Sequence, residues 1–164
     1  MTAEKRSAGP LAQVTANLLG ALIDFPDIFF AKLVQRAGGW PIPSVVPQHD
    51  VDGLQWKDED ERLKVMGYRK GNGEGLESSS EYISRVAGMM RVYFCILKAP
   101  VSSPLDRMFQ LPRYWTWFAR MLSERGLLET AVAPQLLYGS YFILKGFLVF
   151  GWRKLRLSFF FLRS

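Results

Sequence analysis

The chain has 164 residues, enough for one domain with its own core, and 49% of them are hydrophobic, which excludes an intrinsically disordered segment. The net charge of +6 is local. Five of the 21 Lys and Arg residues follow position 144, so the first 144 residues carry 16 cations against 15 acids. This distribution argues against a basic nucleic-acid-binding face across the whole domain.

The predicted elements are helices. We expect residues 1–10 to be a disordered lead and the apolar spacing from Leu11 to Ile23 to form the first helix. Pro26 suits the first turn of a second helix, which Gly38 and Gly39 end. Three prolines then make residues 39–57 a loop.

The acidic run 58–61 favours the start of a short third helix, because negative charge is stabilised at a helix N-terminus. Ser78 and Glu81 have the spacing of a capping box, and the apolar helix that follows to Leu97 is wide enough to be central. A fifth helix begins near Tyr114, and a last apolar stretch starts near Leu127. No alternating run predicts a sheet, so we expect an all-α solenoid-like repeat or bundle.

Catalytic and metal sites lack support in the sequence. One histidine, His49, and one apolar-flanked cysteine, Cys95, exclude a credible triad or zinc site, and a single cysteine excludes an internal disulfide. The glycine run 71–75 lacks the Gly-Lys-Ser/Thr ending of a phosphate-binding loop and is read as a flexible turn. We therefore expect no enzyme and no metal.

Lys32 and Arg36 are the candidate site residues. They lie one turn apart on one helix face. They either neutralise the negative end of that helix or form half of an anion site, in which Arg offers a planar fork of donors and Lys a mobile charge.

Two apolar segments admit a second interpretation. Aromatic residues in 114–118 could stack nucleic-acid bases, but their helical spacing favours core packing. Residues 136–152 could span a membrane, which would make the chain a small single-pass membrane protein. Lys145 in mid-span costs about 3 kcal/mol on insertion scales, so a buried core helix is favoured.

Four blocks occur in a characteristic order. They are Phe-Phe-Ala-Lys-Leu-Val-Gln-Arg at 29–36, Leu-Lys-Val-Met-Gly-Tyr at 63–68, Tyr-Ile-Ser-Arg-Val-Ala-Gly-Met-Met-Arg-Val-Tyr-Phe at 82–94 and Tyr-Trp-Thr-Trp-Phe-Ala-Arg-Met at 114–121. Together they resemble part of the C-terminal helical domain of the Gle-one-like mRNA-export mediators, over residues 15–141.

The resemblance implies a non-enzymatic, HEAT- or MIF4G-like scaffold at the cytoplasmic face of the nuclear pore complex, in the nucleus and cytoplasm. The family's helical domain binds a DEAD-box RNA helicase and stimulates its ATPase cycle for poly(A)+ mRNA export. Inositol hexakisphosphate bridges the two proteins in fungal members. An FG-nucleoporin and translation factors are further implied partners, and direct sequence-specific nucleic-acid binding is not expected. The family's basic pair falls on Gln35 and Arg36, and Lys32 matches the basic position before it.

Two departures from the family pattern lead us to expect an incomplete domain. The earlier half of the family domain has no counterpart here, and residues 148–164 form an atypical basic and apolar tail. The expected organisation is therefore a lead over 1–10, a partial helical domain over 11–147 and this tail. The expected explanation is either a truncated fragment with an aberrant C-terminus or a gene model that runs into non-coding sequence, and in both the site of the FG-nucleoporin is missing.

Overall fold

The structure is a computed structural model that describes residues 3–42, 45–46, 49, 52–71, 73 and 75–145. Its helices are α1 (Ala3–Ala21), α2 (Phe25–Ala37), α3 (Glu59–Val65), α4 (Ser79–Leu97), the 3-10 helix η1 (Arg107–Phe109), α5 (Pro112–Ser123) and α6 (Arg125–Leu128). A further helix covers residues 133–145. In these ranges the chain forms two isolated β-bridges and no strand, so the predicted all-α class is confirmed.

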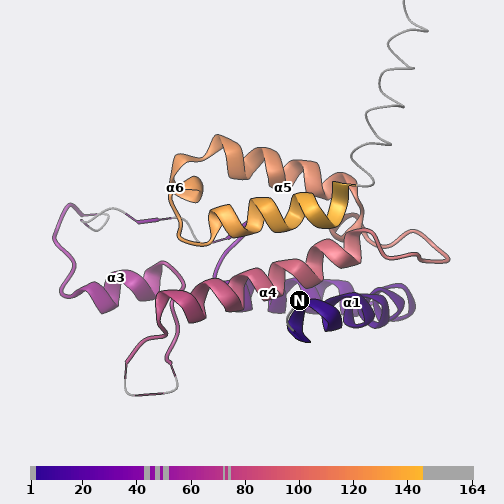
Figure 1. The fold of residues 1–164 in the computed structure, drawn as a ribbon, viewed down its shortest axis with the longest axis horizontal. Coiled ribbons are helices and arrows are strands. Elements are labelled where there is room, and N and C mark those ends of the chain that lie inside the picture. Colours follow the sequence, from indigo (N-terminus) through magenta and orange to yellow (C-terminus); the bar gives the residue numbers. More distant parts are fainter. Residues whose placement is uncertain are drawn as a thin grey trace, which may run out of the picture.

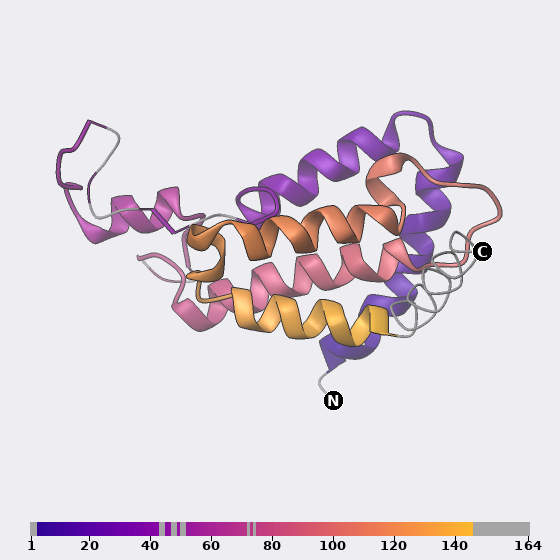
Figure 2. The same ribbon diagram turned by 90° about the horizontal axis from the view of Figure 1, so that it is seen from above.

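Helix α4 is central. Figures 1 and 2 show α4, α5 and helix 133–145 side by side, with α5 running opposite to the other two. On the other side of α4, α1 crosses it, and this contact is the most extensive one among helices α1 to α6. A helix covered on two sides needs a wide apolar surface, as the sequence of α4 predicts.

The core around α4 is aromatic. Phe94 packs edge-on against Trp117 of α5 with ring centroids 4.7 Å apart, and Tyr93 packs in the same way against Trp40 at 5.1 Å. The buried hydroxyl of Tyr93 donates to the Met108 carbonyl at 2.7 Å. Aromatic pairs in these orientations add to the stabilisation from buried area alone, so α4 is held on both sides by large rings.

The predicted disordered lead is wrong for residues 3–10, because α1 begins at Ala3 and runs through Pro10. Small side chains at Ala8, Ala12 and Ala16 are buried along one face of α1, which lies against α4. This packing outweighs the helix-breaking tendency of Gly9 and Pro10.

The helix ends follow the sequence signals closely. Gly38 takes a left-handed φ of 97° after α2, and its N–H donates to the Val34 carbonyl. Asp58 accepts from the Glu61 N–H at 2.7 Å, and Ser78 and Glu81 form both bonds of a capping box. The sequence also suggests that Gly126 closes the fifth helix. In the structure α5 already ends at Ser123, and Gly126 lies inside α6.

Helix 133–145 has one buried face and one exposed face over its described length. Leu136, Ser140 and Leu144 are buried, whereas Tyr138 is 71% exposed. Among the described residues, no helix combines the length and apolar character needed to cross a bilayer. Residues 146–152 of the alternative membrane segment, and the tail expected from residue 148, lie outside the described residues.

Candidate anion-binding site

A group of charged side chains surrounds the C-terminal end of α2. Lys32 and Arg36 are exposed on this helix, and the Lys32 Nζ donates to the Gln35 Oε1 at 3.1 Å. Two further arginines reach the same helix end from other parts of the chain: Arg69 from the segment between α3 and α4, and Arg85 from α4.

Arg69 and Arg85 bind the last carbonyl groups of α2. The Arg69 guanidinium donates to the Gln35 carbonyl, and Arg85 Nη1 donates to the Arg36 carbonyl at 2.5 Å. Carbonyl groups in the last turn of a helix have no partner within the helix and carry its negative partial charge. The two guanidinium groups therefore fill the helix-end role, which was one of the two alternatives for Lys32 and Arg36.

Glu77 organises these arginines. Its buried carboxylate accepts from Arg85 Nε at 3.0 Å, from Arg85 Nη2, and from the Arg69 N–H at 3.0 Å. Burial alone would raise the pKa of Glu77, but the hydrogen bonds from Arg85 and the Arg69 backbone, with the charges of both arginines, lower this pKa below its usual value. Glu77 is thus ionised at neutral pH.

The segment that carries Arg69 is bonded to the residues just before α4 and to α4 itself. The Glu77 N–H donates to the Arg69 carbonyl at 2.7 Å, and Lys70 and Leu76 form a β-bridge. Arg85 Nη2 also donates to the Gly67 carbonyl at 2.9 Å. The backbone on both sides of Arg69 is therefore held in place before any ligand arrives.

Positive charge exceeds negative charge in this cluster. Burial lowers the pKa of Arg69, the charges of Arg85 and Arg36 lower it further, and Glu77 opposes them. The buried carboxylate of Glu77 interacts with Arg69 and Arg85, whereas Arg36 adds a further positive charge beside Arg69, with Lys32 one turn away on α2. An anion placed beside Arg36 and Arg69 would relieve this mutual repulsion.

Tyr68 and Tyr82 form an apolar floor next to the cluster. Their rings stack with centroids 4.1 Å apart, and the Arg85 guanidinium lies 5.5 Å from the Tyr82 ring centroid. Burial, and to a lesser extent the neighbouring Tyr68, raises the pKa of Tyr82 to about 12. The Tyr82 ring orients Arg85, since a guanidinium stacks well on an aromatic face.

The other candidates from the sequence do not converge on a site. His49 is exposed, and within the described ranges no three His, Cys, Asp or Glu side chains are grouped as a metal site would require. Cys95 packs against the core, and burial raises its thiol pKa. The predicted core packing of the aromatic cluster is confirmed for Tyr114 and Trp117, but Trp115 is 46% exposed.

Sequence reasoning missed Arg69, Arg85 and Glu77. Arg85 meets the Arg36 carbonyl across 49 residues, and Arg69 meets the Gln35 carbonyl across 34. No periodicity can pair positions so far apart. The available signal was the position of Glu77. It lies just before the capping box, outside the helix, where no Lys or Arg one helical turn away can neutralise its charge.

The fold and the site together define an all-α helical domain that carries a basic cluster at a helix end. Residues 1–142 match the family of GLE1-like proteins, and the chain belongs to this family. It is 27% identical over 124 residues to the mRNA export factor Gle1 of Drosophila melanogaster, which covers 74% of this chain and 17% of that protein. The resemblance drawn from the four sequence blocks is confirmed. No solved structure matches the chain, so its likeness to HEAT or MIF4G scaffolds stays a prediction.

Proposed function

We propose that the chain acts in mRNA export, as part of a scaffold that binds a DEAD-box RNA helicase and stimulates its ATPase cycle. The observation that carries the proposal is the family match over residues 1–142, supported by the export factor that the chain resembles. Because the chain spans 17% of that relative, the full activity belongs to a larger assembly. In this proposal the chain itself performs no catalysis.

Inositol hexakisphosphate is the proposed bridging ligand, and Lys32 and Arg36 are its proposed contacts on this chain. Their exposure leaves both side chains accessible. The helix end that would otherwise occupy them is already satisfied by Arg69 and Arg85. Because Arg69 and Arg85 already bind the carbonyl groups at the end of α2, Lys32 and Arg36 are more suited to bind an anion than to neutralise the helix end.

Arg69 supplies charge to the same ligand, and Arg85 with Glu77 holds the arrangement together. The pKa of Arg69 is lowered by burial and by Arg85 and Arg36, so a polyphosphate would remove an existing repulsion. Arg36 offers a planar fork of donors for phosphate oxygens, whereas Lys32 offers a point charge. Exposed cations are screened by salt, so binding to this chain alone should be weak and should tighten with the helicase present.

The test is Arg36→Ala in a complex of the full-length protein with its helicase. We expect inositol hexakisphosphate affinity and ATPase stimulation to fall together, and Arg36→Lys to recover only part because the fork is lost. Arg107→Ala is a matched control, since Arg107 is an exposed arginine of η1. Unchanged affinity in Arg36→Ala would contradict the proposed ligand contact, even if stimulation fell.

The proposed location is the cytoplasmic face of the nuclear pore complex, with an FG-nucleoporin and translation factors as partners of the larger protein. This part of the proposal rests on the family resemblance alone. Imaging of a tagged full-length protein should show a signal at the nuclear rim. A diffuse signal that persists with the endogenous protein depleted would count against the location but not against the helicase contact.

A further inference from the structure

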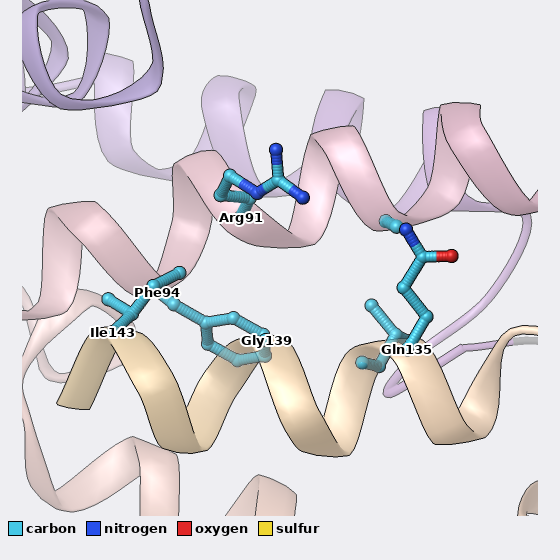
Figure 3. Close-up of a pocket in the computed structure, with 7 residues that line it drawn as sticks. Arg91, Phe94, Gln135, Gly139 and Ile143 are labelled. Carbon is cyan, nitrogen blue, oxygen red and sulfur yellow. The ribbon is translucent and has the colours of Figure 1, made fainter. Parts of the chain in front are cut away.

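A small space between α4 and helix 133–145 is lined by Arg91, Phe94 and Gln135 (Figure 3). Its volume is about 10 Å³, which is room for at most one water molecule. This space is therefore too small for a ligand or for the side chain of a partner. By contrast, α1 carries a continuous apolar surface that is open to solvent, on the side of α4 away from α5 (Figure 1).

The apolar seam of α1 consists of four large side chains that face solvent. Leu11, Val14, Leu18 and Leu22 are each between 41% and 58% exposed. They follow one another at steps of three or four residues, so they form one stripe about 17 Å long. The N–H of Leu22, just after the last residue of α1, donates to the Leu18 carbonyl at 3.0 Å and so continues the helix. Single exposed leucines are normal on a folded chain, whereas a row of them marks an interaction site.

The seam is separate from the two faces of α1 that the fold already uses. One face carries the buried alanines that lie against α4. On another face, Gln13 Nε2 donates to the Pro100 carbonyl at 2.9 Å, in the loop after α4. None of residues 7–22 is charged, so nothing along the seam selects a charged partner. The seam suits an equally apolar and uncharged helix face, which a second copy of α1 provides.

The two ends of α1 differ in charge, and this difference favours a second copy in one orientation. The sequence has two cations, Lys5 and Arg6, against one acid, Glu4, at the start of the helix. Asp24 and Asp27 follow its other end, are exposed, and form no ion pair with any described residue. An antiparallel pair of helices brings each positive end to the negative end of the other copy and also aligns the helix dipoles favourably. A parallel pair would bring like charges together.

We propose that α1 pairs antiparallel with α1 of a second copy of this chain around a two-fold axis. With the axis between Val14 and Leu18, Val14 packs against the partner's Leu18. Leu11 then packs against the partner's Leu22. The same patch covers itself on both copies, as an interface with two-fold symmetry requires. This pairing goes beyond the proposed role in mRNA export and is independent of inositol phosphate and of the helicase.

Sedimentation equilibrium of the full chain tests the pairing. The 18.7 kDa chain should show an apparent mass that rises towards twice this value as its concentration is raised. Leu18→Glu should raise the dissociation constant by about tenfold or more, because it places a charge against the partner's apolar seam. Its circular dichroism spectrum should be unchanged, since Leu18 is partly exposed. Leu122→Glu is the matched control, because Leu122 is a half-exposed leucine on α5, and this variant should still dimerise.

A charge swap tests the antiparallel orientation. Asp24→Lys with Asp27→Lys should weaken the dimer, because like charges then meet at each end. Adding Lys5→Glu and Arg6→Glu should restore it. A monomeric mass at every concentration, a dimer that Leu18→Glu leaves intact, or a swap that fails to restore association would each overturn the proposal. A monomer that sediments with phosphatidylcholine vesicles, and loses this binding in Leu18→Glu, would also overturn it, since the seam would then bind a lipid surface.

Discussion

Replacing Arg85 by alanine should destabilise the domain more than the loss of any other charged residue that the structure describes. The Arg85 side chain donates to both Glu77 oxygens and to the carbonyl groups of Arg36 and Gly67. It thereby joins the end of α2, the turn after α3 and the start of α4. Removal would leave the Glu77 carboxylate, whose side chain is 8% exposed, without its ion-pair partner.

The expected loss in free energy of unfolding is about 2–4 kcal/mol. Breaking a buried ion pair by removing one partner costs about 3–5 kcal/mol. The Arg85 side chain is 21% exposed, so water can replace part of what it supplies. Folded domains are stable by about 5–15 kcal/mol, so urea denaturation would resolve the change easily. Arg85→Lys should recover little, because one ammonium group cannot span the three segments.

A second substitution and the pH dependence separate this mechanism from simple loss of packing. In Arg85→Ala/Glu77→Gln the buried charge is gone, so at pH 7 the double variant should be more stable than Arg85→Ala. The pKa of Glu77 is lowered in the native chain, so its ionisation adds stability above the unfolded value near 4.5 and this stability is lost as the pH falls through the lower folded value. In Arg85→Ala, burial is opposed only by the Arg69 N–H and charge, so this pKa should rise and stability should instead increase as the pH falls from 7 towards 5. A double variant no more stable than Arg85→Ala at pH 7 would refute the reasoning.

Three further outcomes are expected. Ser78→Ala removes the capping box of α4 and should cost about 1 kcal/mol in urea denaturation, whereas Ser84→Ala on the exposed face of the same helix should cost much less. The pKa of Tyr82 is raised to about 12, so its contribution to stability is complete below its ordinary value near 10 and is lost as the pH rises through 12. Ultraviolet titration should therefore count one fewer tyrosine in Tyr82→Phe than in the unchanged chain at the alkaline unfolding transition. The number of tyrosines that ionise near pH 10 should be the same in both. Gly139→Ala should raise the free energy of unfolding by about 0.5–1 kcal/mol, as the methyl group meets no neighbour. A lower melting temperature would show that glycine is needed for the fold.

Local chemistry made most of the helix boundaries predictable. Pro26 and Gly38 bracket α2, and Ser78 with Glu81 begins α4, because each signal acts within one helical turn. The central position of α4 followed from the breadth of its apolar surface. Burial of Trp117 was predictable from helical spacing, because Trp117 lies on the same face of α5 as Tyr114 and Met121.

Contacts between distant segments were beyond the reach of sequence spacing. The early start of α1 depends on how Ala8 and Ala12 face α4, and no local signal near Pro10 could reveal it. The same limit hid Arg69, Arg85 and Glu77, whose roles arise only when three segments meet at the end of α2. Lys32 and Arg36 were found because they are neighbours on one helix, but their function could not be chosen from their spacing.

The distribution of cations around α2 gives a reason to assign different roles to residues of the same charge. Arg85 is fully engaged by Glu77 and by backbone carbonyl groups, so it serves to position other parts of the site. Arg69 is held at the Gln35 carbonyl, and its pKa is lowered first by burial and then by the charges of Arg85 and Arg36. Lys32 and Arg36 remain exposed next to Arg69 and Arg85, which already bind carbonyl groups at the end of α2. A chain that needed cations only to stabilise the end of α2 would already have enough in Arg69 and Arg85, and the surplus on the exposed face is what an anionic ligand would use.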